Sequence, residues 1–419
     1  MKSSIIALFI KVAAGALNYL LFISLSNTFS VNDYSLFVSI FSASMLLSSF
    51  FGAGQQNFII KTFSLEDISS NRILNSLSIL LASIVVCTVV SVTYFYYILD
   101  YTGYIFAGTL LLTLSLSLSH GTLGFLRVQN KLNYALISKD IVWRFLVIVA
   151  ILIFSMFHVS IEYVIFTAGL LMFLLIILQL VKVKLNAKFT DVIRNRPEKS
   201  DVKTSFALAL IALISGADFY LYTIIAHKEF SNLDVSAAFS SFKTVELIGM
   251  FLMVVSLVYS TKIADAVRKN RVDLLQSICN KQMILQIVPT IVCVLIVFFL
   301  SSFLLGLYNA DFKQYALFLQ LLMGIVLFNS LCGSTGSLLQ LCGLQWHHVV
   351  IQSISLILSV IAIYLTMDYF GIYSLIIGYA ISKFLWNILA VTLLIKKVGV
   401  DPTIFGLLKN NNKGNKNEH

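Results

Sequence analysis

The chain has 419 residues, of which 59% are hydrophobic and only 11% are charged, and it carries a formal net charge of +10. No single water-soluble core could hide that much apolar surface, so the composition excludes a soluble globular protein. It indicates a membrane protein that crosses the bilayer many times.

About 20 apolar residues of helix are needed to cross a bilayer core of about 30 Å. Twelve stretches meet this requirement, at 5–26, 35–56, 73–98, 104–126, 136–157, 160–181, 204–226, 235–260, 284–307, 314–341, 348–366 and 372–395. The first follows Lys2 as a signal peptide would. It is too long for the apolar region of such a peptide, so we assign it as a membrane helix.

The sequence contains an internal repeat. Residues 10–50 align without a gap with residues 211–251, and 14 of the 41 pairs are identical. A weaker similarity relates residues 121–151 to residues 333–363. Six helices per half make the repeats parallel, related by an axis along the membrane normal. We therefore predict an all-α fold with two six-helix lobes around a central cavity, at 1–195 and 196–395, and a basic cytoplasmic tail at 396–419.

The distribution of lysine and arginine predicts the orientation. With the amino terminus in the cytoplasm, the cytoplasmic segments carry 22 of the 29 basic residues and the outer loops carry two. Cytoplasmic loops of membrane proteins are enriched in positive charge. Both termini are thus expected in the cytoplasm, and the net charge requires no nucleic-acid partner.

Motifs for soluble chemistry are not found in the sequence. There is no phosphate-binding loop of the Gly-x-x-x-x-Gly-Lys-Ser/Thr type and no His-Glu-x-x-His motif. The five cysteines show no paired spacing, and the histidines form no cluster. We expect no cofactor, no metal site and no use of ATP by this chain.

Ionisable side chains inside the predicted spans are the candidates for function, because burying a charge costs about 2.5 to 3.5 kcal/mol on insertion scales. The basic set is Lys11, Lys139, Arg144, Lys243 and Lys383, and the acidic set is Asp140, Asp218 and Glu246. Helical spacing places Asn18 on the same side as Lys11, and it places Lys243 and Glu246 on one polar stripe. We predict Lys11, Asn18, Arg144, Lys243 and Lys383 as substrate-binding residues.

Each of these residues also has a structural interpretation. Lys243 and Glu246 could neutralise each other, Asp140 and Arg144 could form a local pair, and Lys139 could extend to water. Asp218 and Lys383 have no obvious partner nearby in the sequence. The excess of cations favours an anionic passenger such as phosphate or pyrophosphate. An exporter of organic cations would need the opposite balance.

Several segments resemble polysaccharide-export flippases. They are Ser30-Val31-Asn32-Asp33-Tyr34-Ser35-Leu36-Phe37, Gly52-Ala53-Gly54, the Gly-Ala-Asp-Phe-Tyr of 216–220, Phe125-Leu126-Arg127, and Leu338-Leu339-Gln340 with Gly343. Over nearly its full length the chain resembles the Wzx-type O-antigen flippases of the multidrug/oligosaccharidyl-lipid/polysaccharide (MOP) exporter superfamily. The family has no invariant catalytic residue to transfer to this sequence.

The resemblance implies a bacterial inner-membrane protein that moves an undecaprenyl-pyrophosphate-linked glycan to the periplasmic leaflet by alternating access. Membrane lipid, the O-antigen polymerase and a chain-length regulator are implied partners. Asp218 or Glu246 could in addition bind H⁺ or Na⁺, and the membrane potential could drive the anion outward. Two alternatives stay open: a cation-coupled multidrug-type antiporter, and an O-antigen polymerase or ligase. The enzymes need a large outer loop, whereas the predicted outer loops here are short.

Overall fold

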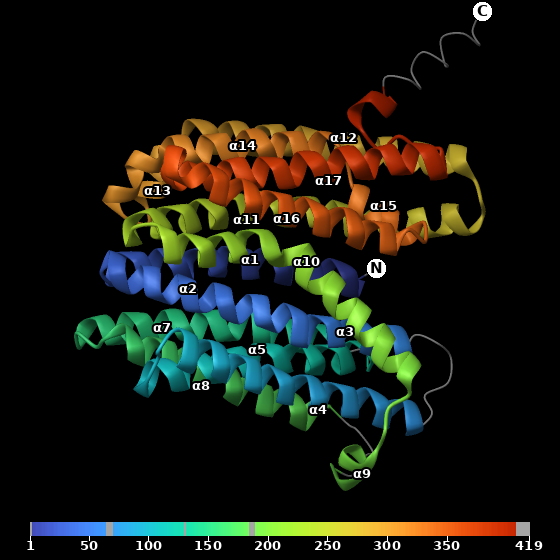
Figure 1. Cartoon of the computed structure of the whole chain (residues 1–419). Coiled ribbons are helices and arrows are strands. Elements are labelled where there is room, and N and C mark those ends of the chain that lie inside the picture. The colour runs from blue at the N-terminus through green and yellow to red at the C-terminus, as the bar shows by residue number, and fades with distance from the viewer. Residues whose placement is uncertain (1, 64–69, 130, 184–188, 408–419) are drawn as a thin grey trace, which may run out of the picture. The chain divides into compact units, whose positions relative to one another are not determined.

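The computed structural model describes residues 2–63, 70–129, 131–183 and 189–407. Over these residues the chain is all-helical and has no β-strand, as the sequence predicts (Figure 1). It divides into two compact units, Met1–Ser236 and Ala237–His419. The predicted lobe boundary near residue 195 stays a prediction. Residues 408–419 of the predicted tail and 184–188 of the predicted basic loop lie outside the described residues.

The first unit is built around a central helix, α5, which packs against α2, α3, α4 and α8. Three π-helical turns, η1 (Ser49–Ala53), η2 (Thr93–Ile98) and η3 (Ile137–Val142), continue or join its helices. The helices are α1 (Lys2–Thr28), α2 (Val31–Ser48), α3 (Gly54–Phe63), α4 (Ser70–Val92), α5 (Gly103–Val128), α6 (Leu132–Leu136), α7 (Trp143–Met156), α8 (Ile161–Lys182), α9 (Phe189–Arg194), α10 (Lys199–Glu229) and the start of α11 (Asn232–Arg268).

In the second unit the two last long helices, α16 and α17, pack along each other, and α14 contacts both α12 and α17. Two 3₁₀ turns, η4 (Ala310–Tyr315) and η5 (Gly371–Tyr373), connect helices of this unit. Its helices are the remainder of α11, α12 (Val272–Phe299), α13 (Ser301–Gly306), α14 (Ala316–Leu331), α15 (Thr335–Leu341), α16 (Gln345–Phe370) and α17 (Ser374–Val398).

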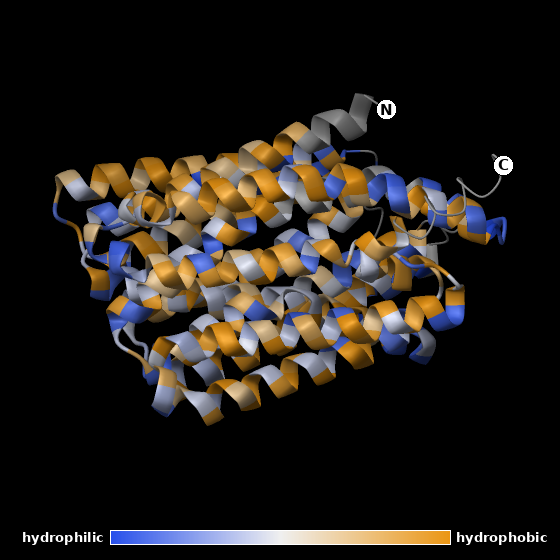
Figure 2. Ribbon diagram, turned by 90° about the horizontal axis from the view of Figure 1, so that it is seen from above, coloured by the Kyte–Doolittle hydropathy of each residue, from blue (hydrophilic) through white to orange (hydrophobic). Residues whose placement is uncertain are grey.

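The helices are long and apolar enough to cross a membrane. Nine segments of the described residues meet criteria of length and hydropathy for a span, and one of them, 345–398, contains both α16 and α17. Two more predicted spans are helical but do not meet the criteria: 136–157 carries three charged side chains, and 235–260 includes side chains outside the described set. In Figure 2 most of the helical ribbon is orange, and blue residues gather toward helix ends and loops. The chain is thus a multi-pass membrane protein.

The internal repeat is visible in local structure. The side chain of Ser30 accepts a hydrogen bond from the backbone N–H of Asp33 at the start of α2 (3.2 Å) and donates one to its carboxylate (2.7 Å). Ser231 and Asp234 repeat both bonds at the start of α11, at 3.2 and 2.6 Å. Such caps satisfy the unpaired N–H groups of a helix's first turn. The repeated sequence therefore starts corresponding helices in the same way.

Helices α5 and α8 approach closely because glycines face each other. A Cβ atom added at Gly169 of α8 would lie 2.8 Å from the carbonyl oxygen of Gly108 and 2.9 Å from the amide nitrogen of Leu112. Small residues permit this approach between membrane helices, where van der Waals packing is a main driving force. The contact fixes α8 against the centre of the first unit.

Gly169→Ala is expected to destabilise the protein by about 1 to 3 kcal/mol, because the added methyl group would force two backbones apart. The matched control is Gly324→Ala in α14, where no atom lies within 4 Å of an added Cβ. Thermal unfolding of the detergent-solubilised variants measures the difference. Equal melting temperatures for the two variants would contradict the proposed close packing.

Candidate functional site

A π-helical turn within a membrane helix carries the first group of charges. The turn η3 places Lys139 and Asp140 between α6 and α7, and Arg144 follows in the first turn of α7. A π turn has an extra residue relative to an α-helix, so it re-aims its side chains, and such turns are frequent at functional sites. Helix α1 packs along η3 and α7. This packing brings Lys11 and Asn18 to the same place.

Asp140 lies at the centre of this group. One carboxylate oxygen is 2.6 Å from the Lys11 ammonium, and the other is 3.5 Å from a terminal nitrogen of the Arg144 guanidinium. The Arg144 Nε donates to the side-chain oxygen of Asn18 (3.1 Å), and its guanidinium also donates to the Asp140 carbonyl oxygen. Three predicted binding residues, Lys11, Asn18 and Arg144, are therefore joined in one network.

The network extends to two residues that the sequence analysis missed, His120 of α5 and Gln56 of α3. The Lys139 ammonium lies 3.0 Å from His120 Nε2, and His120 Nδ1 lies 3.0 Å from the Gln56 side-chain oxygen. An amide oxygen only accepts, so Gln56 favours the ring proton on Nδ1 and leaves Nε2 as the acceptor for Lys139. Lys139 thus points to His120, although its sequence position suggested that it extends to water.

These residues form what we call the cationic cluster: Lys11, Asn18, Gln56, His120, Lys139, Asp140 and Arg144. Its described side chains include three basic residues and one carboxylate, and two of the basic residues, Lys11 and Arg144, pair with that carboxylate. The side chain of Asp140 is 8% exposed, that of Arg144 is 18% exposed, and that of Lys11 is 39% exposed. Half-buried cations with a net positive balance are suited to binding an anion, because partial burial reduces screening by water and salt.

The second group of predicted residues lies in the second unit. The Lys243 ammonium is 2.6 Å from a carboxylate oxygen of Glu246, and it stands 5.2 Å from the centre of the Phe239 ring. The side chain of Lys243 is 4% exposed and that of Glu246 is 33% exposed. The local pairing that the spacing suggested is therefore present. The predicted roles of Lys243 in substrate binding and of Glu246 in ion coupling stay predictions.

Lys383 lies on α17, where Tyr379 and Asn387 are its neighbours on the same helix. Its ammonium stands 5.3 Å from the Tyr379 ring centre, and its backbone carbonyl accepts a hydrogen bond from Asn387 (2.8 Å). Asn387 also donates to Asn329 of α14 (2.8 Å). Lys383 is half-buried. These contacts give α17 a polar face that the hydropathy of the sequence does not reveal.

Asp218, the other predicted ion-coupling residue, lies in the middle of α10 in the first unit and is 9% exposed. A carboxylate at such a position is costly in a membrane, so its interactions with its surroundings must compensate the burial. Its proposed coupling to H⁺ or Na⁺ rests on this placement and stays a prediction.

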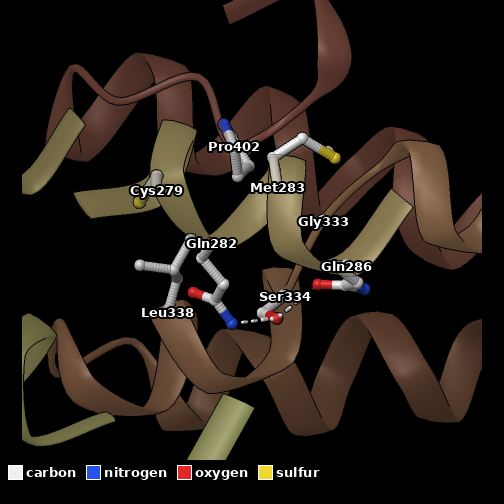
Figure 3. Close-up of a pocket in the computed structure, with 8 residues that line it drawn as sticks. All are labelled: Cys279, Gln282, Met283, Gln286, Gly333, Ser334, Leu338 and Pro402. Carbon is white, nitrogen blue, oxygen red and sulfur yellow. Dashed lines mark hydrogen bonds between the residues drawn. The ribbon is translucent and has the colours of Figure 1, made fainter. Parts of the chain in front are cut away.

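A pocket in the second unit is formed by residues of α12, the α14–α15 junction and the segment after α17 (Figure 3). Gln282 donates to the Ser334 hydroxyl (2.6 Å), which donates to the side-chain oxygen of Gln286 (3.2 Å). The pocket has essentially no volume open to a water-sized molecule, whereas sites for drug-sized ligands begin at roughly 300 Å³. None of the predicted site residues lines it.

Comparisons with known proteins define the fold. No family model and no curated protein matches the sequence. A multidrug resistance MATE family transporter of the MOP superfamily matches in its inward-facing conformation, with a TM-score of 0.70 and 15% identity over 94% of this chain and 98% of that one. An outward-facing conformation matches with a TM-score of 0.66 and 14% identity, over 95% and 96% of the two chains. A MOP superfamily transporter from Pyrococcus furiosus also matches, with a TM-score of 0.66 and 14% identity over 95% of this chain and 96% of that one.

The fold and the buried charges define a class of protein. The chain is a multi-pass membrane protein with the two-lobe fold of MATE-type transporters. This finding confirms the all-α, two-lobe fold that the sequence predicts. Its structural neighbours are transporters of the MOP superfamily, the superfamily that the sequence resembles. At this level of identity the likeness establishes the fold, and the passenger has to be inferred from the residues.

Proposed function

We propose that this protein is a flippase for an undecaprenyl-pyrophosphate-linked oligosaccharide, which it moves from the cytoplasmic to the periplasmic leaflet of the bacterial inner membrane by alternating access. The observation that carries this proposal is the cationic cluster, where Lys11 and Arg144 pair with the carboxylate of Asp140 and Lys139 contacts His120. A net positive site inside a transporter fold suits an anionic headgroup. The resemblance of the sequence to Wzx-type flippases supports the same passenger.

The physics of the task agrees with this assignment. A pyrophosphate with its sugars cannot cross hydrocarbon without a polar route, whereas the polyprenyl tail can remain in lipid. Moving about two negative charges outward across a membrane potential of about 100 mV, negative inside, is downhill and releases about 4 to 5 kcal/mol. The potential alone could therefore drive the step. A return stroke coupled to H⁺ or Na⁺ at Asp218 or Glu246 is part of the proposal.

The polarity of the site separates the main alternatives. The Pyrococcus furiosus transporter is described as having a binding pocket of reverse polarity that suggests a different function, so site charge is a sensible criterion in this superfamily. A cation-coupled multidrug antiporter is favoured by the names of the structural neighbours but would need an anionic site. The transporter fold offers no support for the third alternative, an O-antigen polymerase or ligase.

The test is transport by the purified protein in lipid vesicles. The flippase proposal predicts that a fluorescent polyprenyl-pyrophosphate-linked oligosaccharide crosses the bilayer and that a cationic dye is not exported along a proton or sodium gradient. The antiporter predicts the reverse, with dye export that fails after Asp218→Asn or Glu246→Gln. The second outcome would contradict the proposed passenger.

The proposed orientation places both termini in the cytoplasm. In a variant without the five native cysteines, a single cysteine at residue 230 is expected to react with an impermeant reagent added to whole cells. A cysteine at residue 190 is expected to react only after the membrane is opened. The reversed pattern of labelling would overturn the orientation.

A further inference from the structure

Asp140 is a buried carboxylate that pairs with two cations from different helices. Each of its oxygens carries one cation, with Lys11 on Oδ2 at 2.6 Å and Arg144 near Oδ1 at 3.5 Å. A phosphate group presents its oxygens to lysine and arginine in a comparable way. The carboxylate therefore fills, within the protein, the role that an anionic ligand would otherwise take.

The two cations are held differently. Arg144 is fixed by Asn18 at 3.1 Å, by the Asp140 carbonyl oxygen and by the carboxylate. Lys11 is held by its ion pair with Asp140. Its side chain is 39% exposed, compared with 18% for Arg144 and 8% for Asp140. A lysine ammonium on a flexible stem can turn more easily than a guanidinium fixed at several atoms. An incoming anion would thus meet Lys11 first and draw it from Asp140.

We propose that Asp140 is a built-in competitor of the diphosphate headgroup: it holds Lys11 while the site is empty, yields it to the bound headgroup, and takes it back on release. This inference rests on the proposed function and concerns the regulation of affinity at the same site. Asp140 is thereby an affinity-setting residue.

The charge balance explains why a transporter needs this competitor. By formal charge, the three basic side chains and the one carboxylate sum to +2, which matches a headgroup of about two negative charges. Without the carboxylate the formal sum would be +3, and the cluster would retain its passenger. A ligand that binds one state too tightly is not released, so faster transport requires weaker binding.

The experiment measures binding of inorganic pyrophosphate to the full-length protein in nanodiscs of phosphatidylcholine. Asp140→Asn is expected to bind pyrophosphate about tenfold more tightly than the wild type, which corresponds to about 1.4 kcal/mol, and to translocate lipid-linked oligosaccharide more slowly. Asp140→Glu is expected to restore both values. Structural damage would weaken binding, so a gain in affinity separates competition from a merely structural role.

The matched control is Asp265→Asn. Asp265 also pairs with two cations, Arg268 at 2.9 Å and Lys269 at 2.6 Å, and their hydrogen bonds lower the pKa of its carboxyl group. It lies beyond the predicted span, so its removal is expected to leave pyrophosphate binding unchanged. A second variant, Asp140→Ser, serves if the asparagine variant does not fold.

The outcomes separate this inference from the proposed function. If the wild type binds pyrophosphate and folded Asp140 variants bind it no more tightly, competition by Asp140 is disproved and the flippase proposal survives. If neither binds pyrophosphate, the proposed function fails. The binding measurement is repeated in nanodiscs of phosphatidylglycerol, an anionic lipid. If this lipid abolishes the tighter pyrophosphate binding of Asp140→Asn, the cluster binds the headgroup of a bulk lipid. That outcome would overturn the assignment of a diphosphate ligand.

Discussion

Cells that depend on this protein for surface polysaccharide are expected to lose at least about nine-tenths of it when Arg144 is replaced by alanine. A hydrogen bond to a charged group contributes about 1.5 to 3 kcal/mol, and each 1.4 kcal/mol is a factor of ten in affinity. Arg144 also holds Asn18 in place through its Nε (3.1 Å). The measurement is the amount of surface polysaccharide relative to the amount of protein in the membrane.

Two further variants test whether the loss is specific to the charge and the donor geometry of Arg144. Arg144→Lys keeps the charge but not the forked donors, so partial activity is expected. Lys131→Ala removes a cation outside the cationic cluster, whose ammonium donates to the carbonyl oxygen of Lys182 (2.9 Å), and should leave polysaccharide at the wild-type level. Normal polysaccharide from an abundant Arg144→Ala protein would contradict a binding role for the cluster.

The second large effect concerns Lys243. Its replacement by alanine leaves Glu246 without the ammonium at 2.6 Å, and polysaccharide export is expected to fail. Breaking a fully buried ion pair costs about 3 to 5 kcal/mol. Glu246 is one-third exposed, so the loss of stability here is expected to be smaller. The abundance of the protein should fall less than its activity.

The double variant Lys243→Ala with Glu246→Ala separates the two roles of the pair. If Lys243 serves only to neutralise Glu246, the double variant exports as much polysaccharide as Glu246→Ala alone, because no uncompensated charge remains. We expect the double variant to recover abundance but not export. Lys383→Ala, whose side chain has no acidic neighbour in sequence, should lose export in the same way. Recovery of export in the double variant would show that Lys243 does not bind the substrate.

The fold was predictable because apolar runs and the internal repeat can be read directly from the sequence. Apolar runs of about 20 residues locate the spans wherever charges are few. The repeat showed that Ser30 and Ser231 begin corresponding helices, and the structure gives both the same cap. Pairs three or four residues apart, such as Asp140 with Arg144 and Lys243 with Glu246, follow from helical geometry and are present.

The site was only partly predictable because its contacts join distant segments. Lys11 and Asp140 are 129 residues apart, and Gln56 and His120 are 64 apart. No periodicity in one helix reports such a contact. The turn η3 adds to the difficulty, since a π-helical turn shifts side chains from the faces that an α-helical pattern assigns. Lys139 therefore meets His120 although its position near a helix end suggested contact with water.

The most direct test of the account is translocation of a polyprenyl-pyrophosphate-linked oligosaccharide in vesicles that contain only this protein. The wild type is expected to move the lipid in both directions without a potential and mainly outward with one. The variant Lys11→Ala with Arg144→Ala should not move it above the rate of protein-free vesicles. Translocation by that variant at the wild-type rate would show that the cationic cluster does not bind the passenger.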